Sequence, residues 1–194
     1  MAATTTLLLL KPFKFQNPRS IYSHPAKSTC SSSVTIQAQC AKGNLLSLIA
    51  DQDRGLKTQN NSEKRSQIVE AIDAMATLAA GSVTTGDSLS ATWRLLWTTE
   101  KEQLFIIEKA YLFGTQAGDV LQVIDVQNRS LNNVITFPPN GVFFVRSNIE
   151  IASPQRVNFR FDTVYLDDEI RVVKDIRGDY LVVERAPYTW KERV

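Results

Sequence analysis

Residues 90–99, S-A-T-W-R-L-L-W-T-T, decide the fold of the middle of the chain because they place Trp93 and Trp97 four residues apart. A spacing of four puts both rings on one face of a helix and, being even, also on one face of a strand. Leu89 and Leu96 complete a helical stripe. Against a helix, the stretch is short, is flanked by turn-forming and charged residues, and is rich in Thr and Trp, which favour strands. Periodicity alone leaves both readings open.

The sequence that follows decides the question. From residue 91 onward the chain is a series of short runs rich in β-branched and aromatic residues, separated mostly by turns that contain Gly, Pro or Asn. This pattern is typical of an antiparallel sandwich or barrel. A lone helix at 90–99 would leave an odd, unclosed sheet, so the stretch is predicted to be the first strand. The eight predicted strands cover residues 93–98, 103–108, 119–126, 131–137, 141–151, 155–161, 169–173 and 180–184.

Alternation of apolar and polar residues is clearest around Pro154. Before the turn, Phe143, Val145, Ile149 and Ile151 share one face and Arg146, Asn148 and Glu150 share the other; after the turn, Phe159 and Phe161 alternate with polar neighbours. One buried face and one wet face is what a barrel or a one-sided sheet requires. A barrel of about eight strands is either filled by its own side chains or wide enough for one small ligand. Both outcomes are open at this point.

Two helices are predicted in a lead-in that spans residues 41–90. Residues 44–52 form a short amphipathic pattern with Asn44 as a plausible cap. Residues 66–80 carry apolar side chains at helical spacing, and Gly81 follows as the stop. The apolar stripe predicts a face that packs on the core; the alternative is a face that lies on a membrane.

The first 39 residues have a composition different from that of the rest. They contain four basic residues and no acid, and removing those four from the 22 basic groups leaves 18 against 20 acidic groups, a net charge of −2. The folded part therefore offers no strong attraction to nucleic acid. A Ser/Thr-rich, acid-free leader predicts a disordered plastid transit peptide over residues 1–40, cleaved near 38–41; the alternative is a tail with no targeting role. Its longest apolar run, Leu7 to Leu10, is too short to span a bilayer.

The distribution of histidine and cysteine excludes several kinds of chemistry. His24, the only histidine in the sequence, lies in the leader, as does Cys30, while Cys40 lies at the predicted cleavage region. The mature chain is therefore expected to lack a Cys/His zinc site and any catalytic group based on histidine. No glycine-rich phosphate loop occurs, and we expect neither a metal nor a cofactor.

Three blocks of sequence resemble the plastid lipid-associated protein (fibrillin) family, over roughly residues 42–185. The first is the helical lead-in at 45–72. The second, W-R-L-L-W-T-T at 93–99, resembles the family's W-x-L-x-[YW]-T strand. The third, Y-L-D-D-E-I-R at 165–171 with the following R-G-D and L-V-V at 177–183, is close to the family's C-terminal pattern. The order and spacing of the blocks make the resemblance fairly specific.

This resemblance implies a lipocalin-like antiparallel β-barrel over residues 91–186, preceded by two helices and followed by a tail at 187–194. It implies a plastid protein, peripherally associated with plastoglobules or thylakoids, that binds or stores isoprenoids, quinones, carotenoids or other lipids. It implies no catalytic residue.

Candidate ligand-binding side chains follow from the predicted strands. Trp93 and Trp97 are expected to face the interior together, with Trp93 as a packing plug and Trp97 nearer the mouth as a ligand contact. Filled core is an equal alternative for the remaining candidates. These are Phe105, Ile107, Phe143, Val145, Phe159 and Phe161.

The carboxylates at 167–169 are the one acidic cluster. Only Asp167 and Glu169 would share a strand face, and as a catalytic pair they would have to converge on one pocket. We interpret them as a solvated strand entry. Two alternatives to lipid binding remain: a scaffold protein with a filled barrel that acts through protein partners and, less favoured, a lipid-modifying enzyme that uses this pair.

Overall fold

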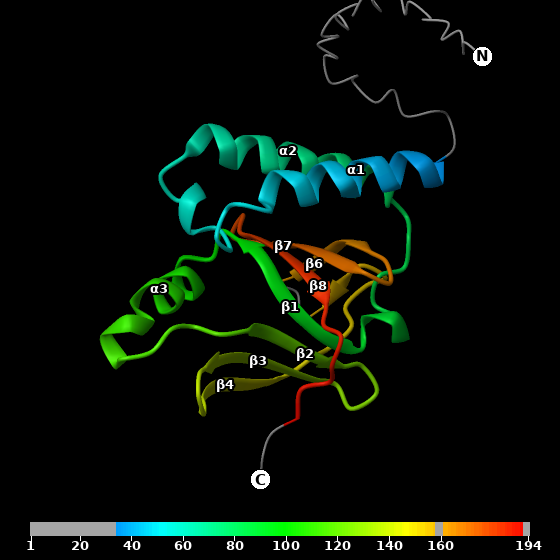
Figure 1. Ribbon diagram of the computed structural model, residues 1–194. Helices are drawn as coiled ribbons and strands as arrows, with labels where there is room; N and C mark the ends of the chain where they lie inside the picture. Colours follow the sequence, from blue (N-terminus) through cyan, green and yellow to red (C-terminus); the bar gives the residue numbers. More distant parts are fainter. Residues whose placement is uncertain (1–33, 158–160, 192–194) are drawn as a thin grey trace, which may run out of the picture.

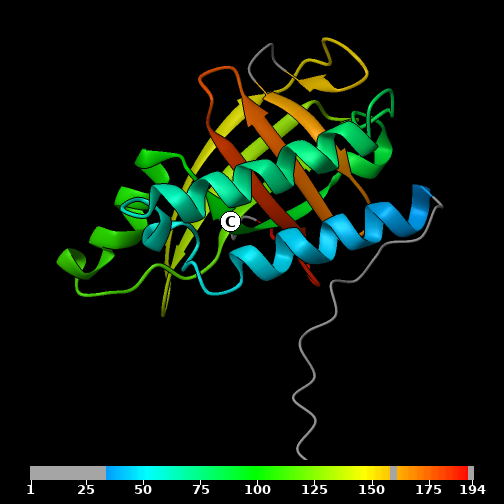
Figure 2. The ribbon, with the colours of Figure 1, turned by 90° about the horizontal axis from the view of Figure 1, so that it is seen from above.

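A computed structural model describes residues 34–157 and 161–191, with the side chains of Val34 and Phe113 left aside. Its centre is one antiparallel sheet of eight strands that curls into a half-barrel (Figure 1). Two long helices lie side by side across the outer face of this sheet, as the view from above shows (Figure 2). The mostly-β, lipocalin-like class with N-terminal helices that the sequence predicts is therefore confirmed.

The sheet is an up-and-down meander whose first and last strands pair with each other. Its order is β4-β3-β2-β1-β8-β7-β6-β5, so the sheet is continuous through β1 and β8 and has its two edges at β4 and β5. A single bridge between Ile151 and Val157 joins the ends of these two edge segments. The strands are β1 (Ala91–Thr98), β2 (Val120–Asp125), β3 (Ser130–Phe137), β4 (Gly141–Asn148), β5 (Arg156–Val157), β6 (Phe161–Leu166), β7 (Ile170–Asp175) and β8 (Tyr180–Arg185).

Two predicted strands differ from the structure. Residues 103–108 belong to a helix, α3 (Lys101–Lys109), which continues into the 3-10 helix η3 (Ala110–Phe113). The sheet still has eight strands, because β6 is a strand that was not predicted. Within the described residues, the strand expected over 155–161 is represented by the two-residue β5. In α3, Leu104 and Ile107 are buried while Phe105 is exposed, a helical spacing that the short apolar run concealed. Glu102 in the first turn and Lys109 in the last also suit the helix dipole.

A β-bulge in β1 separates the two tryptophans. Leu95 pairs with Val183 of β8 and Trp97 pairs with the next residue, Val182, so Leu96 is an extra residue on the β1 side. One extra residue moves every later side chain to the opposite face. Trp93 therefore points into the barrel, whereas Trp97 points outward. The prediction that both rings share the interior face is wrong.

The bulge divides the buried apolar residues between two cores. The interior core lies on the concave side of the sheet and contains Leu89, Trp93, Leu95, Ile107, Val120, Ile124, Leu131, Ile135, Ile149, Val157, Val173, Leu181 and Val183. The outer core lies between the sheet and the two long helices and contains Leu45, Ile49, Ile68, Ala71, Ile72, Met75, Trp97, Ile170, Val172 and Val182.

The long helices, α1 (Val34–Ile49) and α2 (Ser62–Leu78), both begin earlier than the sequence indicated. The Asn61 side chain caps α2 by accepting a 2.9 Å hydrogen bond from the Lys64 backbone N–H. The stripe predicted in α2 does face the sheet, which confirms the core reading over the membrane one. Residues 34–40 belong to α1, so the expected disorder of the leader does not extend to them. Residues 1–33 lie outside the described part.

The connection between α1 and α2 is fastened to the end of β1. Asp53, Arg54 and Gly55 have positive φ angles and turn the chain sharply, before the 3-10 helix η1 (Leu56–Thr58). At Gly55 a Cβ atom would lie 2.2 Å from the Thr98 carbonyl oxygen, so only glycine fits. The Thr98 N–H donates to the Arg54 carbonyl at 3.1 Å. The Trp97 indole N–H also donates to the Thr58 hydroxyl at 3.1 Å.

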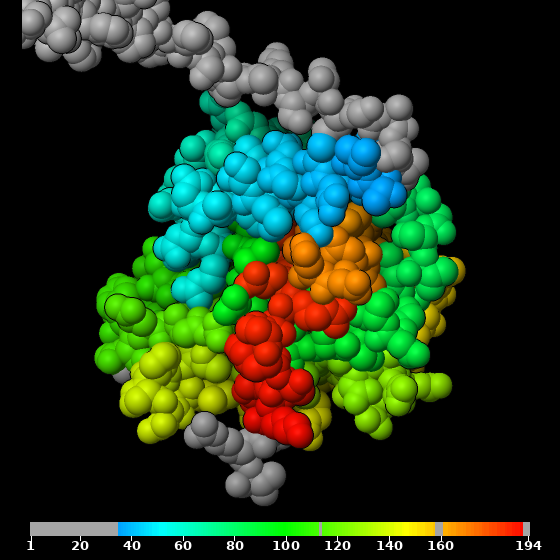
Figure 3. Space-filling model, turned by 45° about the vertical axis from the view of Figure 1, so that its right-hand side comes forward, coloured from blue at the N-terminus to red at the C-terminus, as the bar shows by residue number. Residues whose placement is uncertain are grey.

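An ion-pair cluster attaches α1 to the turn between β6 and β7. Lys42 Nζ lies 2.8 Å from a carboxylate oxygen of Asp167 and 2.8 Å from one of Glu169, and the Tyr165 hydroxyl donates to Asp167 at 2.9 Å. The space-filling view shows this turn (orange) directly against α1 (blue) (Figure 3). Burial alone would raise the pKa of Asp167. The hydrogen bonds that its carboxylate accepts, chiefly from Lys42, outweigh burial and lower the pKa below the ordinary value. The carboxylates considered as a catalytic pair thus face α1 and not the concave side of the sheet.

Glu100 stands at the start of α3 with a carboxyl group that is largely removed from water. Gln103 donates a side-chain hydrogen bond to it, and Asp179 and Asp175 lie close enough to act on it electrostatically. Burial, with a smaller contribution from these two carboxylates, raises the pKa of Glu100 to about 7.

Both buried tryptophans are expected to act as packing residues. Trp93→Ala and Trp97→Ala should each lower the free energy of unfolding by about 3–5 kcal/mol, because each leaves a cavity in a different core. Trp190→Ala, in the partly buried tail, should cost much less. Urea unfolding of the three variants measures the difference. A cost for Trp97→Ala similar to that for Trp190→Ala would contradict the assignment of Trp97 to a core.

The raised pKa of Glu100 predicts that stability falls as pH rises. Between the ordinary value of 4.5 and about 7 the folded state holds a proton that the unfolded state has lost. The slope contributed by this one proton is up to about 1.4 kcal/mol per pH unit, and the loss is complete above pH 7. Glu100→Gln should flatten the profile of melting temperature against pH over this window. Glu102→Gln, an exposed carboxylate in the same turn, serves as the control; equal profiles for wild type and Glu100→Gln would refute the prediction.

Candidate ligand-binding site

Trp93 belongs to the interior core on the concave side of the half-barrel. Its ring is fully buried, and its indole N–H donates to the Leu89 carbonyl at 2.9 Å. The Arg185 guanidinium lies 4.6 Å from the centre of the ring. Arg185 in turn donates to the carbonyls of Asp168 and Ser88, at 2.8 and 2.9 Å. Trp93 is therefore a packing residue of the interior core.

The concave side also carries a groove of about 220 Å³. Strands β1, β2, β3, β4 and β8 form its walls and α3 borders it. Its lining is mostly apolar, with Glu102, Gln103, Gln122 and Asn133 as polar members. The apolar side chains include Leu95, Ile106, Val120, Ile135, Phe143 and Val145.

The groove continues toward α3 into a more open cavity of about 440 Å³. Ile106 and Phe143 line both spaces, and Phe137 and Thr115 complete the second one. This volume lies in the range of about 300–1,000 Å³ that is typical of small-molecule sites. The opening exists because β4 is an edge strand. Phe143, on the inner face of β4, is 51% exposed as a result.

The predicted ligand contacts are distributed over several environments. Phe143 and Val145 line the groove together, as expected from their alternation. Ile107 is part of the interior core, and Phe161 packs against that core and lines a small cavity beside Arg171. Trp97 lies in the outer core, on the wrong side of the sheet for the groove. Phe159 lies outside the described residues.

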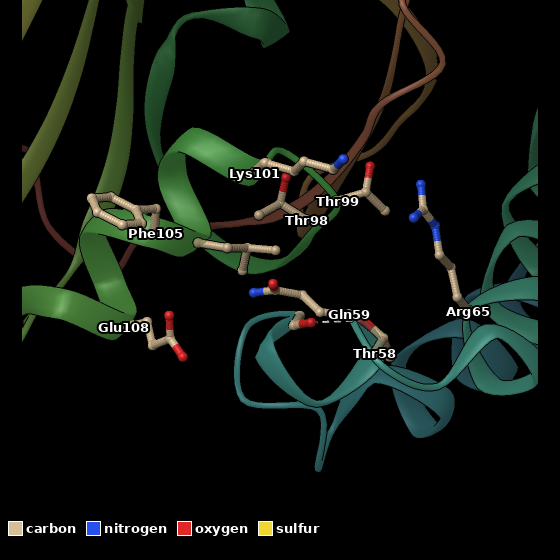
Figure 4. A pocket seen from close by; sticks show the side chains of 10 residues that line it. Thr58, Gln59, Arg65, Thr98, Thr99, Lys101, Phe105 and Glu108 are labelled. Atoms are coloured by element: carbon tan, nitrogen blue, oxygen red, sulfur yellow. Dashed lines mark hydrogen bonds between the residues drawn. The ribbon is translucent and has the colours of Figure 1, made fainter.

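Phe105 lies on the far side of α3 from the groove, because the predicted strand there is a helix. It is 60% exposed and borders a separate hollow of about 260 Å³ between α3 and the connection from α1 to α2. Figure 4 shows Phe105 and Glu108 on one side of this hollow and Arg65 on the other, with Thr98 and Thr99 between. Most of the residues that line this hollow are polar or charged, whereas most of those that line the groove are apolar.

The structure also brings together polar interior residues that the sequence analysis did not select. Arg171 of β7 donates from Nη1 to Gln122 of β2 at 2.7 Å and from Nε to Thr163 of β6 at 3.2 Å. Gln122 donates onward to Asn133 of β3 at 3.1 Å. This polar line crosses the interior from one wall to the other. The sequence did contain a signal for these residues. Gln122 and Asn133 each have apolar residues two positions before and two positions after them, which places both on the inward face of their strands.

The described residues show neither a metal centre nor a membrane-spanning helix. Residues 34–157 and 161–191 contain no group of three or more His, Cys, Asp or Glu side chains placed to hold a metal ion. None of the helices in the same ranges combines the length and the apolarity needed to cross a bilayer.

Comparison with known proteins identifies the family. The PAP_fibrillin family model matches residues 39–164. The probable plastid-lipid-associated protein 11, chloroplastic, of Arabidopsis thaliana is 64% identical, in an alignment that covers 80% of this chain and 84% of the relative. No solved structure matches the chain. The relative supports the plastid localisation expected from the leader, and the protein is a plastid protein. With a family model over more than half of its length and a relative of this identity, the chain belongs to the PAP_fibrillin family of plastid lipid-associated proteins.

Proposed function

We propose that the protein binds a hydrophobic metabolite or lipid, of the isoprenoid, quinone or carotenoid kind, in the groove on the concave side of its half-barrel. The observation that carries this proposal is a mostly apolar groove on the concave side that continues into an open cavity beside α3. A pocket with this shape receives an elongated apolar molecule from one side and buries much of its surface. The printed name of the Arabidopsis relative, a plastid-lipid-associated protein, is in keeping with such a ligand.

We further propose that the protein works at a plastoglobule or thylakoid surface, as a peripheral protein. The supporting observation is a group of exposed apolar side chains on α3, which borders the groove, and on η3, which follows it: Phe105, Tyr111 and Leu112. Such side chains can enter the surface of a lipid layer, where each contributes apolar area removed from water. Ligand exchange with the lipid phase would then occur at the mouth.

In this proposal the protein acts without catalysis. The carboxylates once considered as a catalytic pair, Asp167 and Glu169, both bind Lys42 on the side of the sheet that α1 covers. They therefore cannot act on a molecule in the groove. The scaffold alternative, in which the barrel is filled and a protein partner is the target, is favoured if the ligand experiments below fail.

The groove can be tested with two neighbouring residues of β4 that point in opposite directions. Phe143 (51% exposed) lines the groove, whereas Val142 (50% exposed) lies on the outer face of the same strand. A short-chain plastoquinone analogue should bind wild type in isothermal titration calorimetry. Phe143→Asp should weaken binding at least about tenfold, because it places a charge in an apolar site. Val142→Asp should leave affinity unchanged; equal effects of the two substitutions, or no binding to wild type, would contradict the assignment.

Membrane attachment can be tested with a second matched pair. Leu112 on η3 and Ile176 in the turn between β7 and β8 are both 64% exposed. In flotation with vesicles of plastid galactolipids, Leu112→Asp should reduce the bound fraction several-fold, because a charge on this surface opposes insertion. Ile176→Asp should float like wild type. Loss of flotation in the Ile176 variant alone would place the lipid-contacting surface elsewhere.

A further inference from the structure

A charged side chain, that of Arg171, lies inside the barrel. Arg171 is 4% exposed, and its position on β7 places it on the same inner face as Val173 of the interior core. Its pairing partner on β8 is Val183, also an interior residue. An arginine at such a position is uncommon, because arginine is almost never fully buried without a partner of opposite charge.

The partners of Arg171 are all neutral. Its hydrogen bonds go to the Gln122 side-chain oxygen and the Thr163 hydroxyl, and among the described residues no carboxylate forms an ion pair with it. Burial lowers the pKa of Arg171 to about 10, which still leaves the group positively charged at neutral pH. Amide and hydroxyl oxygens offset part of the cost of removing this cation from water, but they do not neutralise its charge.

The guanidinium is located where the apolar groove ends. A small cavity of about 20 Å³ adjoins Arg171 and is otherwise lined mainly by apolar residues such as Leu89, Ile124 and Phe161. Gln122 lines both this cavity and the groove, so its side chain lies between the two spaces. A molecule that enters from the α3 end along the groove therefore reaches Gln122 first and Arg171 behind it.

We propose that Arg171 binds the carboxylate of a single-chain acidic lipid, such as a fatty acid or an isoprenoid acid, whose chain lies in the groove. This inference rests on the proposed function and goes beyond it by assigning the head group of the ligand. The Gln122 oxygen, 2.7 Å from Nη1, marks the position that a carboxylate oxygen takes when Gln122 turns aside. The flat guanidinium can hold both oxygens of a carboxylate. The single positive charge and the narrow space favour a carboxylate over a bulkier phosphate with more charge.

The experiment compares an acid with its own neutral ester. Full-length protein is titrated with cis-parinaric acid, a fluorescent fatty acid, and with its methyl ester, which has the same chain. Wild type should bind the acid at least about tenfold more tightly than the ester. Arg171→Gln, which retains a neutral donor toward Gln122, should reduce this preference to less than about threefold while ester binding persists. Persisting ester binding shows that the groove of the variant is intact.

Arg156 provides the matched control. It is an exposed arginine of β5 whose guanidinium pairs with Asp162 at 2.6 Å, outside the groove. Arg156→Gln removes the same charge from the protein and should keep the full preference for the acid. If Arg171→Gln fails to fold, Arg171→Lys replaces it; this variant keeps the charge without the planar fork and should show an intermediate preference. A full wild-type preference in either folded Arg171 variant would overturn the proposal.

The remaining outcomes separate this proposal from the function on which it rests. Equal affinity of wild type for acid and ester would refute the role of Arg171 and leave the apolar groove as a binding site. Failure of both probes to bind would refute the groove itself. In a competition arm, lauric acid should displace the bound probe more effectively than dodecyl phosphate does. The reverse order would show that the site selects phosphate head groups and would overturn the carboxylate assignment.

Discussion

The extra residue at Leu96 is the constraint on which the rest of the structure depends. Because of it, a single strand supplies a tryptophan to each of two cores: Trp93 to the interior and Trp97 to the outer face. The outer ring then requires a cover, which α1 and α2 provide, and a hydrogen-bond partner, which Thr58 provides from the segment between them. The helices are thus part of the same folding unit as the sheet. Their position leaves the concave side free to open toward α3.

The sequence predicted the class of the fold because alternation and turn residues are local signals. It did not predict the bulge, because a bulge is visible only when the pairing partner is known, and Val182 lies 85 positions away from Trp97. It also misread 103–108, since a run of only four apolar residues, 104–107, is too short to distinguish a strand from a helix. The early start of α1 was missed because the leader's composition, rich in Ser and Thr, argued for disorder there.

The candidate site shows the same division. Phe143 and Val145 were identified correctly as sharing one face because they are two positions apart in a strand, and both line the groove. Trp97 and Phe105 were misplaced by one bulge and one helix. Arg171 was not selected, because in the sequence a charged residue in a strand is normally outward-facing, and the second bulge, between Thr163 and Tyr165 of β6, adjusts the neighbouring wall. Polar side chains that face the interior can therefore be identified only when the pairing register of the strands is known.

The pairing of β1 with β8 has a consequence for the order in which the chain can fold. The outer-face residues of β1 acquire their neighbours on β8 only after about 85 further residues are available, and Trp97 stays partly uncovered until then. Contacts between such distant segments close slowly, because a long loop must lose its entropy first. When the chain emerges from its N-terminus first, one edge of β1 therefore remains unpaired until β8 has emerged. During that interval the exposed edge of β1 has to be protected from aggregation.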